Sequence, residues 1–165
     1  MATWVPPPPG HYKLHFDDAS KGNPGTAGAG MAILDHNAVL ISAQCHALGF
    51  HSNNFAKCQA LSLGIDMAIS LGIKHLHIQG DSMVVIQSVL NCKSNCWYLK
   101  YLIDHILEKL SFFDTYMLSH CFRELNKLAD FLANLAIDSA AFYKNVEIGD
   151  IPQDVLLGYM PLPED

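Results

Sequence analysis

The stretch "KLHFDDASKGNPGTAGAG", residues 13–30, decides how the rest of the chain can fold. Its first five residues belong to "HYKLHFD" (11–17), whose alternation is typical of a β-strand with two different faces. The segment "KGNPG" that follows is rich in turn-forming residues. Small residues then lead into an apolar run, "GAGMAILD" (28–35). We therefore predict two antiparallel strands joined by a turn, with Asp17 and Asp18 at the end of the first strand.

The segments beyond this hairpin alternate between strand and helix patterns. A third strand, "AVLISAQCHAL" (38–48), completes an antiparallel meander. A helical period then runs over residues 52–71, between an Asn/Ser entry and Gly72. The same two patterns recur further along, with strands predicted over 73–80 and 113–122 and helices over 81–91, 96–110 and 124–140. The expected fold class is α/β, with a five-stranded mixed sheet flanked by helices.

The composition suits one folded unit with a distinct segment at each end. The chain has 165 residues, of which 50% are hydrophobic, and we expect one domain over residues 12–142. Residues 1–11 form a proline-rich arm, because four consecutive prolines favour an extended conformation. Residues 143–165 form an acidic tail that contains the apolar segment "VLLGYMPL". That segment either packs against its own domain or binds a protein partner.

Charge and cysteine usage limit the classes of partner. The chain carries ten basic and sixteen acidic residues, so only weak binding to RNA or to an RNA/DNA hybrid is expected. It contains neither a long apolar run nor a signal peptide, and we expect no membrane association. An odd number of cysteines, five, suits free thiols in a reducing compartment. These features predict an intracellular protein of the cytoplasm or nucleus.

Three aspartates fall where the predicted sheet would bring them together. Asp17 ends the first strand, Asp81 ends the fourth, and Asp130 lies in the first turns of the last helix. Taken singly, they read as a turn residue, a helix N-cap and a solvated helix face. Together they predict a cluster of carboxylates at the ends of adjacent strands.

Four motifs in order along the chain carry a family resemblance: "KLHFDDASKGNPGTAGAG", "SNNFAK..AL..G", "LHIQGDS" and "HCFRELNKLADFLA". The chain resembles type 1 ribonuclease H, and most closely the plant ribonuclease H-like domains related to retrotransposon reverse transcriptases. The resemblance implies hydrolysis of the RNA strand of an RNA/DNA hybrid. In the family this hydrolysis uses two divalent ions, Mg or Mn, which are held by four carboxylates in the order Asp, Glu, Asp, Asp.

The resemblance makes Asp17, Asp81 and Asp130 the expected catalytic residues and metal ligands. The family's glutamate position is occupied here by Lys57, and Asp18 stands where the family has glycine.

Other positions match the family more loosely. The resemblance implies that Asn23, Asn53 and Asn54 meet the hybrid, although turn formation and helix capping explain them equally. His120 lies near the place of a loop histidine that helps product leave in some relatives; a strand-end histidine without that role is the alternative.

Lys57 changes the chemistry that the motifs imply. Helical spacing places it on the stripe of Leu61, Gly64 and Ala68 that should face the sheet, and so toward Asp17 and Asp81. The loss of the glutamate removes one metal ligand. The ammonium of Lys57 also repels a divalent ion, by on the order of several kcal/mol. We therefore expect Lys57 to replace a metal and to pair with Asp17, Asp81 or Asp18.

Three functions remain open from the sequence. The favoured one is a ribonuclease H-like protein that is catalytically impaired or inactive and still binds nucleic acid. The alternatives are an active hybrid ribonuclease that uses Asp17, Asp81 and Asp130, or a protein-interaction scaffold. The cofactor is Mg or Mn if the enzyme is active, and none if Lys57 takes the place of the metal.

Overall fold

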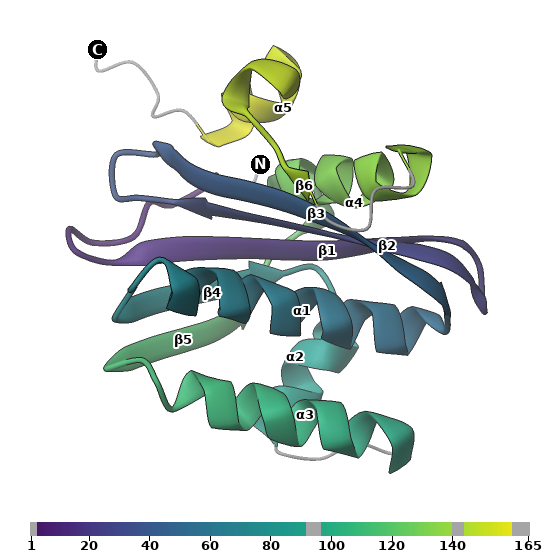
Figure 1. Ribbon diagram of the computed structural model, residues 1–165. Coiled ribbons are helices and arrows are strands. Elements are labelled where there is room, and N and C mark those ends of the chain that lie inside the picture. The colour runs from purple at the N-terminus through teal and green to yellow at the C-terminus, as the bar shows by residue number, and fades with distance from the viewer. Residues whose placement is uncertain (1–2, 92–96, 140–143, 160–165) are drawn as a thin grey trace.

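The computed structural model describes residues 3–91, 97–139 and 144–159. Within them the chain forms a mixed sheet of six strands in the order β5-β4-β1-β2-β3-β6. Helices α1, α2 and α3 lie on one side of this sheet, and α4 and α5 lie on the other (Figure 1). No helix in these described ranges is both long and apolar enough to cross a membrane.

From β1 to α4 the elements follow the predicted order, and β6 and α5 come after them. The strands are β1 (Tyr12–Gly22), β2 (Gly25–Leu34), β3 (Leu40–His51), β4 (His75–Gly80), β5 (Thr115–His120) and β6 (Lys144–Asn145). The helices are α1 (Asn53–Ser70), α2 (Met83–Leu90), α3 (Trp97–Leu110), α4 (Lys127–Ser139) and the short α5 (Gln153–Leu156).

The predicted meander is confirmed, and the strand count is corrected. Strands β1, β2 and β3 pair antiparallel, while β4 runs parallel to β1 and β5 runs parallel to β4. The predicted sheet had five strands, but β6 adds a further one through the pairs Gln44↔Asn145 and Cys45↔Lys144. A two-residue strand is too short to show alternation, so its place is decided by pairing with β3.

Each face of the central strand β1 packs against a different helix layer. Leu14 and Phe16 belong to the core that includes α1 and α3. The second core, on the α4 side, contains Leu128 and Leu132 of α4 and also Trp4 and Tyr159. Residues outside the predicted 12–142 unit therefore contribute buried side chains to the fold.

Small residues in β2 let α4 approach the sheet closely. A Cβ atom at Gly30 would lie 2.2 Å from the carbonyl oxygen of Ala129, and one at Gly28 would lie 2.6 Å from that of Ala133. The glycines of "GTAGAG" thus permit close packing between strand and helix.

The substitution Gly30→Ala should destabilise the protein by about 1–3 kcal/mol, because the added methyl group meets backbone that cannot move without shifting α4. Urea denaturation measures this loss. Gly149→Ala is the matched control, since a Cβ there meets nothing within 4 Å, and it should change the free energy of unfolding by less than about 0.5 kcal/mol. Equal effects at the two positions would contradict the packing argument.

Candidate active site

The predicted aspartates are brought toward one another by β1, β4 and α4. The parallel pairing of His15 with Gln79, extended by two residues, sets Asp17 opposite Asp81 just beyond the end of β4. Asp130 lies in the first turn of α4, the helix that packs across β1 and β2. Asp17 is 8% exposed, whereas Asp130 is exposed to solvent.

Asp17 is a buried acid with other carboxylates close by. Burial is the largest cause that raises the pKa of Asp17 to about 8; the charges of Asp81, Asp18 and Asp130 act in the same direction, and the backbone N–H of Asp18 opposes them. This N–H donates to Oδ1 of Asp17 at 2.8 Å. The site therefore holds more carboxylate charge than its own surroundings compensate.

Lys57 pairs with Asp18. Its Nζ atom lies 3.0 Å from Oδ1 of Asp18, and the two side chains are 31% and 6% exposed. Burial raises the pKa of Asp18, and Lys57 acts against that shift. The expected direction toward Asp17 and Asp81 is thus corrected, although Asp18 was among the three acids named. Asp18 shares the face of Leu14 and Phe16, because alternate side chains of β1 point to the same face.

A second cation, missed by the sequence analysis, lies beside Asp81. Nε of Arg123 is 3.7 Å from Oδ2 of Asp81, and the arginine side chain is 90% exposed. Such an exposed contact contributes little to stability. Its sequence signal was the single arginine in "HCFRE", between the last long strand and the helix that carries Asp130.

The donor atoms suit a hard cation, but they do not form a complete coordination site. Asp17, Asp81 and Asp130 offer the carboxylate oxygens that Mg²⁺ and Mn²⁺ prefer. Among the described residues, no three His, Cys, Asp or Glu side chains converge closely enough to hold a metal ion. Asp17, Asp81 and Asp130 remain the candidate ligands, because the charges of Asp81 and Asp130 both act on Asp17.

The asparagines lie at the junction of the β1–β2 turn and α1. The backbone N–H of Asn53 donates to Oδ1 of Asn23 at 3.1 Å. Oδ1 of Asn53 is buried and has no hydrogen-bond partner among the described residues. The helix cap is Ser52, whose hydroxyl accepts from the N–H of Phe55, and Asn54 follows in the first turn of α1.

His120 ends β5, and its ring packs edge-on at 6.0 Å from that of Phe122. No described contact joins it to the three aspartates.

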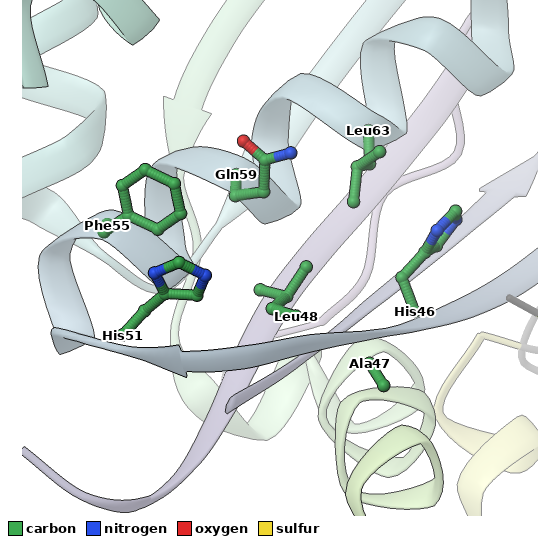
Figure 2. A pocket seen from close by; sticks show the side chains of 7 residues that line it. All are labelled: His46, Ala47, Leu48, His51, Phe55, Gln59 and Leu63. Atoms are coloured by element: carbon green, nitrogen blue, oxygen red, sulfur yellow. The ribbon is translucent and has the colours of Figure 1, made fainter. Parts of the chain in front are cut away.

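A pocket lies apart from the acidic cluster. It measures about 490 Å³ and opens between β3 and α1 (Figure 2). Its lining residues are His46, Ala47, Leu48, His51, Phe55, Gln59 and Leu63. None of them is a predicted site residue. The sequence analysis missed it because Phe55, Gln59 and Leu63 follow ordinary helical spacing.

The strand order, with carboxylates at the ends of β1 and β4 and at the start of α4, defines a ribonuclease H-like domain. Residues 15–136 match the family described as reverse transcriptase-like, and the chain belongs to this family.

Sequence relatives support the same assignment. Ribonuclease HI of Halobacterium salinarum is 30% identical over 132 residues, covering 79% of this chain and 66% of the relative. A bifunctional protein of Mycobacterium tuberculosis is 34% identical over 139 residues, covering 78% and 36%. The chain thus spans about two thirds of the first relative and about a third of the second.

Solved structures agree in fold. RNase H1 from Halobacterium salinarum has a TM-score of 0.76 at 29% identity, covering 78% of this chain and 98% of that one. LC11-RNase H1 in complex with an RNA/DNA hybrid has a TM-score of 0.73 at 26% identity, with the same coverage.

Asp17→Asn should stabilise the fold. The pKa of Asp17 rises from 3.8 to about 8 on folding, so its protonated form favours the native state. That stability is fully present below pH 3.8 and is lost as the pH rises through about 8. A neutral asparagine avoids the loss, and we expect a gain on the order of 2 kcal/mol at pH 7 and almost none near pH 3.5.

Urea denaturation across this pH range measures the gain. Asp150→Asn, which makes the same charge change at an exposed residue beyond β6, is the control. A gain that does not depend on pH would show that Asp17 is not the strained acid.

Proposed function

We propose that this ribonuclease H-like domain binds RNA/DNA hybrid weakly and hydrolyses it poorly or not at all. The observation that carries the proposal is the ion pair between Lys57 and Asp18 at 3.0 Å, formed next to the buried Asp17. The resemblance of the motifs assigns a metal-ligating glutamate to the position of Lys57. The proline-rich arm and the acidic tail resemble the flanks of the plant ribonuclease H-like domains, and this likeness supports a relation to those domains of retrotransposon origin.

The donor set fits one divalent cation better than two. Asp17, Asp81 and Asp130 supply oxygen ligands. The pKa of Asp17 is raised first by burial and then by the neighbouring carboxylate charges, which a cation would compensate. A bound Mg²⁺ or Mn²⁺ would stabilise charge on the reacting phosphate oxygens. Lys57 offers no ligand, and its ammonium opposes a cation on its side of Asp17. Asp18 offsets part of this repulsion, and the two side chains occupy space beside β1 that a glycine would leave open.

Two alternatives keep different support. The retained Asp17, Asp81 and Asp130 favour an active hybrid ribonuclease. A scaffold that binds a protein partner through the tail has less support, because Tyr159 is buried and Leu156 is half-buried against the α4 side of this same domain. Weak nucleic-acid binding follows from the net charge of −6 and from the few cations near the aspartates.

The double variant Lys57→Glu/Asp18→Gly should hydrolyse a hybrid at least ~10-fold faster than the natural chain in Mg²⁺, because it restores a ligand and removes the ammonium. Initial cleavage rates of a labelled hybrid measure this, with Mn²⁺ as a second condition. Adding Asp17→Asn to the double variant is the control and should abolish the gain.

Two results would decide against this explanation. If the natural chain already cleaves as fast as the double variant, and Asp17→Asn abolishes both activities, the protein is an active ribonuclease. If the double variant remains silent in both metals, Lys57 is not what limits the site.

Binding should depend on salt and on the sugar of the second strand. We expect dissociation constants of roughly 10⁻⁶ to 10⁻⁴ M for the hybrid, with weaker binding to double-stranded DNA, because recognition of RNA uses the ribose hydroxyl. Fluorescence anisotropy at several salt concentrations measures this. Arg123→Ala should lower the slope of log affinity against log salt by about 0.9.

Lys144→Ala, at the opposite edge of the sheet on β6, is the matched control and should leave that slope unchanged. Equal binding of hybrid and double-stranded DNA with no salt dependence would favour the scaffold.

A further inference from the structure

Two aromatic side chains from opposite ends of the chain meet on the α4 side of the sheet. Trp4 is 7% exposed and Tyr159 is 3% exposed, although they lie 155 positions apart in the numbering. Their ring centroids are 5.6 Å apart, with the rings edge to face. The ring of His15 lies 5.4 Å from that of Tyr159, so the three side chains form one buried aromatic contact.

Trp4 starts a chain of hydrogen bonds whose direction is determined. An indole N–H can only donate, and Nε1 of Trp4 donates to Nε2 of His15 at 2.8 Å. His15 must therefore carry its proton on Nδ1, which donates to Oδ1 of Asn126 at 3.0 Å. The amide nitrogen of Asn126 in turn donates to the carbonyl oxygen of Phe16 at 2.9 Å. His15 and Asn126 are both 0% exposed, so water cannot take the place of these hydrogen bonds if they are lost.

This chain of hydrogen bonds leads toward the acidic cluster at two places. Phe16 directly precedes Asp17 in β1. The carbonyl oxygen of Asn126 accepts the backbone N–H of Asp130 at 3.1 Å, at the start of α4. Asn126 therefore joins the strand that carries Asp17 to the helix that carries Asp130.

Tyr159 holds the same helix start from the tail. Its hydroxyl accepts the N–H of Leu128 at 3.3 Å and donates to the carbonyl oxygen of Leu125 at 2.8 Å. These two residues flank Asn126. The first N–H groups of a helix need acceptors from outside it, and the Asn126 side chain is already used by the chain of hydrogen bonds from Trp4. The tail thus supplies the cap that the local sequence does not.

We propose that Trp4 and Tyr159 are positioning residues, which hold the start of α4, and with it Asp130, in register with Asp17. The catalytic consequence rests on the proposed function, in which Asp17 and Asp130 belong to one metal-dependent site. The two ends of the chain are then parts of the site's support.

Conservative variants test the proposal. Trp4→Phe keeps a ring and removes the N–H donor, and Tyr159→Phe keeps the ring and removes the hydroxyl. Trp97→Phe and Tyr101→Phe are the matched controls, because these side chains are 85% and 73% exposed on α3. Amide hydrogen exchange is followed at Leu128 and Asp130, with Met31 of β2 as an internal reference. Ring ¹⁵N chemical shifts report the tautomer of His15.

We expect the natural chain to hold His15 with its proton on Nδ1, and Trp4→Phe to populate both tautomers. Tyr159→Phe should raise exchange at Leu128 at least ~10-fold, and Trp4→Phe should raise exchange at Asp130 at least ~3-fold, with no comparable change at Met31. In the Lys57→Glu/Asp18→Gly background, both variants should lower kcat for hybrid cleavage and leave KM unchanged.

The proposal is overturned if His15 of the natural chain carries its proton on Nε2. It also fails if exchange at Leu128 and Asp130 is unchanged, or if it rises by the same factor at Met31, since that is a loss of global stability. If Trp4→Phe does not fold, the tautomer in the natural chain and the exchange in Tyr159→Phe still decide. A background variant that does not cleave contradicts the proposed function alone, because exchange and tautomer are measured without cleavage.

Discussion

The alternation of side chains along β1 is the constraint on which the rest of the structure depends. β1 is a central strand with helices on both faces, so each of its side chains must suit one of two buried environments. Leu14, Phe16 and Asp18 face α1, whereas His15 bonds to groups on the α4 side. Placing two acids in succession therefore sends one carboxylate to each layer. Lys57 compensates Asp18, while Asp17 remains strained at the junction of the sheet with α4.

That strain explains why the polar groups of this protein are arranged as they are. A buried carboxylate with a raised pKa costs stability, and such costs are typical of functional sites. Close to it, the buried side chains of His15, Asn126 and Tyr159 are hydrogen-bonded. A hydrogen-bonded network beside an acid with a raised pKa keeps the backbone fixed where the charge is least stable. The Lys57–Asp18 pair fits this pattern, because each charge would be costly without the other.

Much of the fold could be predicted from local patterns. Ser52 caps α1 and the meander runs through β3, as the residue types indicate, whereas the fit of α4 against Gly28 and Gly30 was not predicted. The candidate site was predicted in part. Parallel pairing of β1 with β4 brings Asp17 opposite Asp81, but the partner of Lys57 required the face of Asp18 to be read from the alternation as well.

β6 was missed because two residues carry no periodicity. Arg123 was missed because a contact to Asp81 depends on how β5 leads into α4.

The sequence by itself determined the order of elements from β1 to α4 and the identity of the acids, because these depend on turn chemistry, hydrophobic period and residue type. Only the tertiary structure decided which charges meet. It also decided that Trp4 and Tyr159, near the two ends of the chain, close over His15 and support the start of α4. The physical reason is that most of these contacts join residues far apart in the sequence, such as Lys57 with Asp18, 39 positions apart, and Trp4 with Tyr159, 155 positions apart. Their formation is set by packing in three dimensions, to which no local pattern refers.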